Sequence, residues 1–224
     1  ADIPVFIDLP APRGYVTQRV IEKGKRTSHF VQQTFDRDLC WLVGLIEADL
    51  KLHDMKKQGP FKKSTVIFVE KRITSNYLAL FLQQLGYSFE PMNSDYVVTD
   101  NKETIQRMLN GEIQGLVATN KLSRGQDIPD VDHVIVFEMA ESFNDYKHRI
   151  GRTGRMGQGG RVTVMFNVQK DEKHIVPLVH FMSYHKQIVP QWLWELYCIY
   201  SREQSADVTS HSDSFVSAGT EMSA

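Results

Sequence analysis

The 224-residue chain lacks several features that would place it in a specialised class of proteins. It has no excess of basic residues, because 26 Lys and Arg are balanced by 27 Asp and Glu. General affinity for nucleic acid is therefore excluded, and contact with a polyanion must come from clustered residues. The two cysteines, Cys40 and Cys198, match neither a disulfide framework nor a paired-cysteine metal motif. We expect both of them to be reduced.

Long hydrophobic runs are also missing. No apolar run approaches 18 residues, and no charged-then-apolar signal segment opens the chain, so we expect neither a membrane partner nor secretion. The sequence shows no internal repeat, and its length suits one compact domain. Because the first residue is Ala, we expect that a further segment precedes it.

From residue 65 onward, short apolar runs alternate with segments of helical spacing. These runs are apolar throughout and rich in β-branched residues, which is typical of strands covered on both faces. We therefore predict an α/β domain with three layers, in which a mainly parallel sheet is flanked by helices. The predicted strands are TVIFV at 65–69, GLVAT at 115–119, HVIVF at 133–137 and RVTVMF at 161–166.

Several segments around these strands are predicted to be helical. Residues 33–52 place apolar side chains three and four positions apart along one stripe. Three shorter helices carry capping signals at their starts, and two of them have a glycine after their ends. The expected boundary residues are Thr74 or Ser75 with Gly86, Asn101 with Gly111, and Ser142 for the last helix.

The ends of the chain differ from its middle in composition. Residues 1–14 contain three prolines, so we predict a linker or the end of a preceding domain. One domain is predicted over 15–199. Residues 200–224 are rich in Ser and poor in bulky apolar side chains, and we expect them to be disordered.

The segment YKHRIGRTGRMGQGG at 146–160 concentrates arginine and glycine. If 143–152 is helical, with Gly151 inside the helix, Arg149 and Arg152 leave the same face near its C-terminus. Such a cationic helix end is favourable against the helix dipole, which needs no ligand. The glycines instead indicate close approach of a backbone or a ligand, and guanidinium groups match the phosphates of a nucleotide triphosphate. Both interpretations stay open on these residues alone. The buried side of the helix is predicted to consist of Phe143, Tyr146 and Ile150.

The stretch HRIGRTGR at 148–155 resembles motif VI of the DEAD-box RNA helicases. ATNKLSRGQDIPDVDHVI at 118–135 resembles motif V, and VIFVEKR at 66–72 resembles motif IV, in the order that the family has. The similarity covers roughly residues 15–195 and implies the family's C-terminal RecA-like domain. QIVPQWL at 187–193 is similar to the end of this domain in the Vasa-type branch.

The resemblance implies that this domain and an N-terminal RecA-like domain of the same protein close over ATP. Arg152 would contact the γ-phosphate, and Arg149 would contact the same phosphate or the opposing carboxylates. His148 and Arg155 would hold the closed interface together. Asp127 would contact the ribose from an ATP-facing loop that also contains Gly125.

The resemblance also implies RNA binding through the sugar–phosphate backbone, because a motor that unwinds duplexes should not read bases. Thr119 lies at the end of its strand, where open α/β sheets bind ligands, and matches a threonine that bonds a phosphate. Gly125 would bring its backbone close to the RNA, and Lys71 and Arg72 lie at the motif IV edge. Ordinary roles at a strand end and a solvated helix start stay open for Thr119, Lys71 and Arg72.

The sequence departs from the family between motifs IV and V. The Gln and Arg of the family's QxxR element fall near Val98 and Asn101, so the RNA or interdomain contact of those side chains is not carried over. Motif V has Asn120 and Gln126 where Asp and Leu are common.

The chain contains no P-loop, because Arg19 stands where the glycine preceding Gly24 by five residues is required. It also contains no DEAD tetrad, so we expect Mg²⁺ to be held by the N-terminal domain and this chain alone to be inactive. The predicted function is the C-terminal motor domain of an ATP-dependent RNA helicase that unwinds or remodels RNA and RNP.

The alternative prediction is a non-catalytic docking module for a protein partner in an RNP complex. It is favoured by the altered stretch at 92–106 and by the lysine-rich connection at 51–63. Protein partners in RNP assemblies are compatible with either function. We expect a cytoplasmic protein, with RNP granules as one site and the nucleus left open.

Overall fold

The structure is a computed structural model that describes residues 16–22, 31–55, 64–119, 128, 130–154 and 159–202. The chain divides into two compact units, residues 1–170 and residues 171–224. The single domain predicted over 15–199 spans parts of both units. The predicted linker at 1–14 lies outside the described residues. Of the predicted disordered tail at 200–224, residues 200–202 are helical, and the rest lies outside the described residues.

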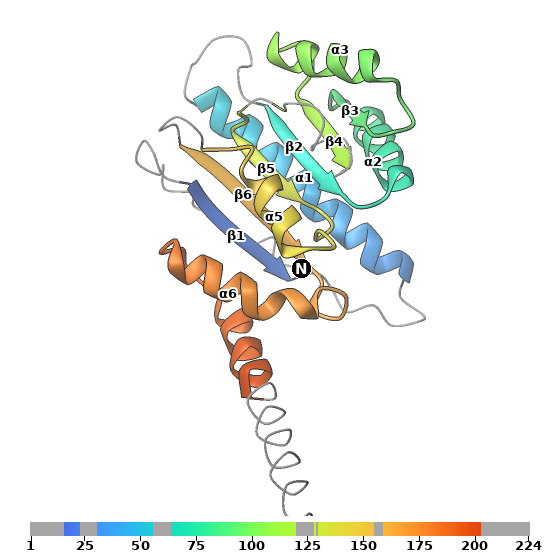
Figure 1. Cartoon of the computed structure of the whole chain (residues 1–224). Coiled ribbons are helices and arrows are strands. Elements are labelled where there is room, and N and C mark those ends of the chain that lie inside the picture. Colours follow the sequence, from blue (N-terminus) through green and yellow to red (C-terminus); the bar gives the residue numbers. More distant parts are fainter. Residues whose placement is uncertain are drawn as a thin grey trace, which may run out of the picture. The chain divides into compact units, whose positions relative to one another are not determined.

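The first unit is built around a sheet of six strands in the order β1-β6-β5-β2-β4-β3 (Figure 1). Every neighbouring pair is parallel. The four interior strands are the four that the apolar runs predict, and the α/β prediction is confirmed. The strands are β1 (Val16–Glu22), β2 (Thr65–Val69), β3 (Phe89–Met92), β4 (Gly115–Thr119), β5 (His133–Val136) and β6 (Gly160–Phe166).

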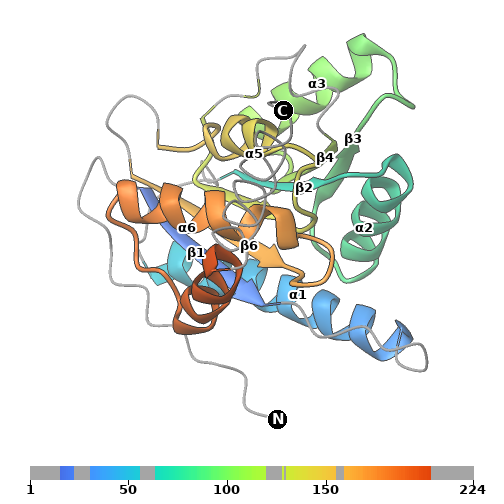
Figure 2. The same cartoon turned by 60° about the horizontal axis from the view of Figure 1, so that its bottom comes forward.

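Helices cover both faces of this sheet. Leu42 and Ile46 of α1 (Val31–Met55) pack with Leu78 of α2 (Arg72–Gln84) and with Ile67 of β2 in the hydrophobic core. Phe68 points to the opposite face, which α5 (Phe143–Ile150) covers. Figure 2 shows α1 and α5 on opposite sides of the sheet. The predicted three-layer arrangement is therefore confirmed.

Helix α2 starts earlier than its predicted capping residues. Its N-cap residue is Lys71, which makes no side-chain capping bond. The Ser75 hydroxyl instead donates to the Val117 carbonyl oxygen at 2.7 Å, inside the core. The prediction that Thr74 or Ser75 caps the helix is wrong, because this buried bond to β4 uses the Ser75 hydroxyl. Gly86 follows the helix with φ of 89°, as predicted.

Helix α3 (Val98–Leu109) also starts before its predicted first residue. Asn101 lies inside the helix and is buried, and its side-chain amide donates to the carbonyl oxygens of Tyr96 and Val97. The prediction that Asn101 begins the helix is therefore wrong. Gly111 follows the helix with φ of 76°, as predicted. Helix α1 extends to Met55, so the first part of the predicted connection at 51–63 is helical.

The second unit contains a short 3₁₀ helix (Glu172–His174), α6 (Ile175–Tyr184) and a further helical segment at 191–202. The predicted domain end at residue 199 falls inside that last segment. Its Tyr197 hydroxyl lies 3.0 Å from the His180 ring, and Trp194 lies against the Tyr197 ring. Among the described residues, no helix has the length and apolar character that a membrane crossing requires.

Candidate functional site

The carboxyl ends of β2, β4 and β5 are the first part of the candidate site. Ligands of open parallel sheets bind at this edge, since loops and helix starts meet there. Glu70 and Lys71 follow β2, Thr119 ends β4, and Glu138 lies just beyond β5. Lys71 is exposed, as expected for a residue that faces a ligand or solvent.

Thr119 combines burial with an unused hydroxyl. The residue is only 3% exposed, and its Oγ1 atom has no hydrogen-bond partner among the described residues. Thr119 pairs in register with Val69 of β2, so it lies beside the segment at 66–72 that resembles motif IV. The predicted contacts of Gly125 and Asp127 lie outside the described residues, as does Arg155.

Helix α5 begins as predicted and ends earlier than predicted. The Ser142 hydroxyl caps it by accepting a hydrogen bond from the Asp145 amide at 3.1 Å. The helix ends at Ile150, with Gly151 as its C-cap, so the prediction that Gly151 lies inside the helix is wrong. Tyr146 is buried as predicted, whereas Phe143 and Ile150 are only half-buried.

Arg149 is the largest fully buried side chain, with 0% exposure. Its guanidinium forms an ion pair with Glu70, donates to the Glu138 carbonyl oxygen at 2.5 Å, and lies 5.4 Å from the centre of the Phe68 ring. The prediction that Arg149 and Arg152 share an open helix face is therefore wrong. Burial places Arg149 as an internal link between α5 and the ends of β2 and β5, which sequence spacing could not indicate.

Glu70 and Glu138 form the acidic surroundings of this arginine. The Glu70 amide donates to a Glu138 carboxylate oxygen at 2.7 Å. Burial, which Arg149 offsets only in part, raises the pKa of the Glu70 carboxyl, and the nearby charges of Glu138 and Glu141 act in the same direction. Burial likewise lowers the pKa of the Arg149 guanidinium. The sequence analysis missed Glu70, although its place directly after a buried strand was a usable signal.

Arg152 is half-buried and lies in a turn beyond the end of α5. Its amide donates to the Arg149 carbonyl oxygen at 3.1 Å, and its own carbonyl oxygen accepts from the Val131 amide at 2.9 Å. The Thr153 hydroxyl donates to the Val131 carbonyl oxygen. Val131 belongs to the segment that resembles motif V. These two hydrogen bonds to Val131 therefore join the segment that resembles motif VI to the segment that resembles motif V. His148 is exposed, and its ring lies 3.2 Å from the Asn144 side-chain amide.

Arg72 lies at the start of α2 and forms an ion pair with Asp95. The prediction placed this arginine at a solvated edge or against RNA, and the structure adds a carboxylate partner that the sequence analysis missed. Asn101, at the position of the family's Arg, instead holds the loop after β3 through its side-chain amide.

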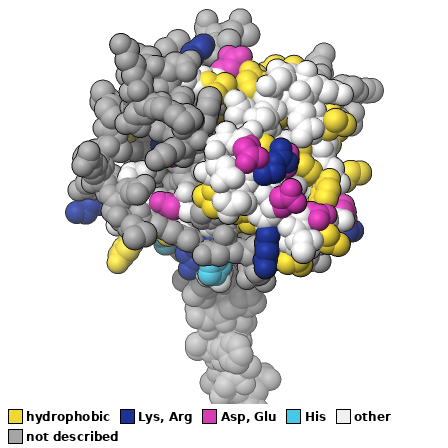
Figure 3. Space-filling view, turned by 90° about the horizontal axis from the view of Figure 1, so that it is seen from above, with side chains coloured by type: hydrophobic (Ala, Val, Ile, Leu, Met, Phe, Trp, Pro, Cys, Tyr) yellow, Lys and Arg dark blue, Asp and Glu magenta, His cyan; other side chains and the backbone are white. Residues whose placement is uncertain are grey.

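One face of the described surface carries charges of both signs. Figure 3 shows acidic and basic side chains interspersed on the face seen from above. No group of three or more His, Cys, Asp or Glu among the described residues is arranged to hold a metal ion. Any contact with a polyanion by the described residues therefore depends on individual side chains such as Arg72 and Arg152.

Comparison with known proteins agrees with this arrangement. Residues 49–157 match the helicase conserved C-terminal domain family. The ATP-dependent RNA helicase vasa of Drosophila melanogaster is 36% identical over 129 residues, which are 58% of this chain and 20% of that protein. The human probable ATP-dependent RNA helicase DDX4 is 36% identical over 132 residues, which are 59% of this chain and 18% of that protein. The chain thus spans about a fifth of the length of these relatives.

Solved structures show the same fold. The yeast DEAD-box splicing factor Prp28 is similar with a TM-score of 0.65 at 23% identity, over 84% of this chain and 38% of that chain. The Escherichia coli DEAD-box protein SrmB, solved with the regulator RraA, has a TM-score of 0.53 at 29% identity, over 71% of this chain and 82% of that chain. The fold and the site therefore define a RecA-like helicase domain. More particularly, the chain is similar to the C-terminal helicase domain of DEAD-box RNA helicases.

Proposed function

We propose that this domain works as the second motor half of an ATP-dependent RNA helicase that unwinds or remodels RNA and RNP. In this proposal it is inactive until an N-terminal RecA-like domain of the same protein closes over ATP. The observation that carries the proposal is the turn at Arg152, which one backbone hydrogen bond and the Thr153 hydroxyl, both to Val131, hold beside the motif V segment. A guanidinium carried on such a fixed turn is suited to stabilise charge on a transferring phosphoryl group.

The roles of the arginines differ in this proposal. Arg152 contacts the γ-phosphate. Arg149 fixes α5 to Glu70 and to the end of β5, and thereby positions the turn that carries Arg152. His148 and Arg155 complete the interface with the N-terminal domain, and Asp127 and Gly125 face the nucleotide. Mg²⁺, held by the N-terminal domain, would neutralise phosphate charge.

RNA contacts the same domain through its sugar–phosphate backbone in this proposal. The unused hydroxyl of Thr119 supports a phosphate contact at the end of β4, and Lys71 and Arg72 lie at the neighbouring strand end. We further propose that the protein acts in the cytoplasm, including RNP granules.

The substitution Arg152→Ala in the full-length protein tests the nucleotide role. We expect RNA-stimulated ATP turnover to fall by about 10³–10⁵-fold, because arginine fingers contribute this much in related phosphoryl transfer. Arg107→Ala is the matched control, since Arg107 on α3 pairs with Glu90 and Glu112 and has no proposed contact with ATP. Turnover of Arg152→Ala equal to that of the control would remove the assignment.

A docking module without catalysis is the second candidate. Its support is the stretch at 92–106, where the family's Gln and Arg are not kept near Val98 and Asn101, and where the Asn101 side-chain amide donates to carbonyl oxygens of the loop after β3. This candidate requires that Arg152→Ala leaves partner binding unchanged and that the full-length protein turns over no ATP with RNA present.

A further inference from the structure

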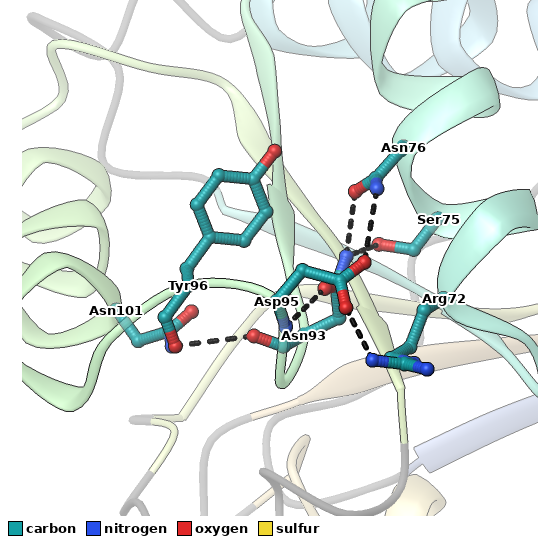
Figure 4. Close-up of polar contacts among 7 residues, drawn as sticks. All are labelled: Arg72, Ser75, Asn76, Asn93, Asp95, Tyr96 and Asn101. Atoms are coloured by element: carbon teal, nitrogen blue, oxygen red, sulfur yellow. Dashed lines mark hydrogen bonds and ion pairs between the residues drawn. The ribbon is translucent and has the colours of Figure 1, made fainter.

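A polar cluster joins the start of α2 to the loop after β3 (Figure 4). We call it the Arg72 cluster and define it as Arg72, Ser75, Asn76, Asn93 and Asp95. Arg72 forms an ion pair with one carboxylate oxygen of Asp95. Asn76, one helical turn further along α2, donates to the other oxygen at 3.3 Å.

The Asp95 carboxylate is held in place by more than this ion pair. The Asp95 amide donates to the Asn93 side-chain oxygen at 2.9 Å. Asn93 is fully buried, and its amide donates to Asn76 at 2.7 Å and to the Ser75 hydroxyl at 3.1 Å. Asn101 fixes the same loop from α3 through the Asn93 and Tyr96 carbonyl oxygens. The loop therefore presents a preorganised anion to Arg72.

The Arg72 cluster lies at the strand ends that flank Thr119. Arg72 follows β2 and Asp95 follows β3, and these strands are the two neighbours of β4, which Thr119 ends. The Arg72 side chain is 60% exposed and that of Asp95 is 40% exposed. A phosphate that approaches this edge from solvent therefore meets a guanidinium that already has a carboxylate partner.

We propose that Asp95 sets the RNA affinity of this domain by competing with an RNA phosphate for the Arg72 guanidinium. The inference rests on the proposed RNA contact at this edge. Carboxylate and phosphate oxygens accept hydrogen bonds from the same guanidinium, and the Asp95 contact occupies one amino group of Arg72 and offsets its charge, so a phosphate binds Arg72 more weakly while Asp95 is paired with it. Asn76 donates to the other Asp95 oxygen, so this carboxylate has a second hydrogen-bond partner besides Arg72.

The test measures binding of a fluorescein-labelled single-stranded oligouridylate to the full-length protein by fluorescence anisotropy, with a nonhydrolysable ATP analogue, over a series of KCl concentrations. For Asp95→Asn we expect binding about two- to five-fold tighter, in proportion to the modest strength of an exposed ion pair. The slope of log affinity against log salt should steepen by at most about 0.7, the value for one full contact to single-stranded RNA, because Arg72 already makes this contact part of the time in the wild type.

Two further variants separate competition from a general charge effect. Arg72→Ala should bind RNA more weakly than the wild type, and adding Asp95→Asn to it should change nothing further. Glu90→Gln is the matched control, because it also removes a carboxylate from an arginine pair, on the side of β3 that faces α3. Its RNA affinity should equal that of the wild type.

Each outcome decides the question. Unchanged affinity of Asp95→Asn overturns the inference, and so does equal tightening with and without Arg72. Should Asp95→Asn fail to fold by circular dichroism, Asp95→Ser is measured in its place with the same expectation. If Thr119→Val weakens RNA binding while Asp95→Asn has no effect, only this inference fails. If the wild type binds no RNA at all, the proposed function fails with it.

Discussion

At the scale of single residues, the Thr119 hydroxyl is the clearest group without a structural task. A buried hydroxyl that lacks a partner costs about 1–3 kcal/mol of stability, so its removal should not destabilise the fold. We therefore expect Thr119→Val to keep or increase the free energy of unfolding and to weaken RNA binding by about 10- to 100-fold, the equivalent of one hydrogen bond to a charged group. Urea unfolding and oligouridylate binding measure the two effects.

Thr163 provides the reciprocal control, because its buried hydroxyl lies 2.8 Å from the His133 ring nitrogen. Thr163→Val should lower the free energy of unfolding by about 1 kcal/mol and leave RNA affinity unchanged. If both valine variants lose RNA affinity to the same extent, Thr119 has no specific contact.

Arg149 shows what residue types and spacing cannot reveal. Arg149 and Arg152 are equivalent in the sequence, three positions apart in one glycine-rich segment. Arg149 nevertheless has 0% exposure. Its partner Glu70 lies 79 positions away in the chain and contacts it at the strand ends. Only the sheet order brings these two groups together, so the motif could be recognised and the burial could not.

At the scale of elements, β6 packs closely against the turn that carries Arg152. A methyl group added at Gly160 would lie 2.8 Å from the Gly154 amide nitrogen and would also clash with the Thr153 side chain. Gly160→Ala should therefore displace the turn, lower the free energy of unfolding by about 1–3 kcal/mol, and reduce ATP turnover of the full-length protein. Thermal unfolding and turnover with saturating RNA measure these effects.

Gly44 is the control for that substitution. It lies on the exposed side of α1, with no atom within 4 Å of an added methyl group. Gly44→Ala should raise the free energy of unfolding by about 0.4–1 kcal/mol, because alanine restricts the unfolded chain and favours helix. A larger loss in Gly44→Ala than in Gly160→Ala would refute this account of the turn.

The strands that the sequence predicts and those it misses differ in where they lie. The interior strands β2, β4 and β5 are buried along their whole length, which makes their apolar runs continuous. The edge strand β1 has the sequence VTQRVIE, in which polar residues interrupt the apolar ones. The other edge strand, β3, contains Pro91, which an edge tolerates because one side of the strand needs no ladder hydrogen bonds. The sequences of β1 and β3 therefore lack the continuous apolar runs that predict the interior strands.

At the scale of the whole molecule, the contacts of the Asp49 carboxylate couple the free energy of unfolding to pH. Asp49 on α1 contacts the His133 ring at 2.7 Å and Arg161 at 2.7 Å, and so ties the helix to β5 and β6. Burial by itself would raise the pKa of the Asp49 carboxyl, but His133 and Arg161 outweigh it and lower that pKa. A lowered pKa stabilises the native state above the ordinary value of about 4, and this stabilisation is lost as the pH falls through the native value.

Asp49→Asn tests this coupling. At pH 6–7 we expect the variant to be less stable than the wild type by about 1.5–3 kcal/mol, the worth of hydrogen bonds to a charged group. The difference should shrink as the pH falls below about 4, since protonation then removes the same charge from the wild type. Urea unfolding across this range gives the difference directly. Glu103→Gln, an exposed change on α3, should show no such trend, and a difference that stays constant with pH would contradict the coupling.

The pairing of β1 with β6 has a consequence for how the protein folds during its synthesis. The first described strand aligns with the last one of the sheet, Val16 beside Gly160 and Glu22 beside Phe166. During synthesis on the ribosome, β1 therefore leaves the exit tunnel long before its partner exists, and the sheet can close only when β6 has followed. Contacts so distant in sequence form slowly, and β1 stays without its strand partner until translation has passed the arginine segment.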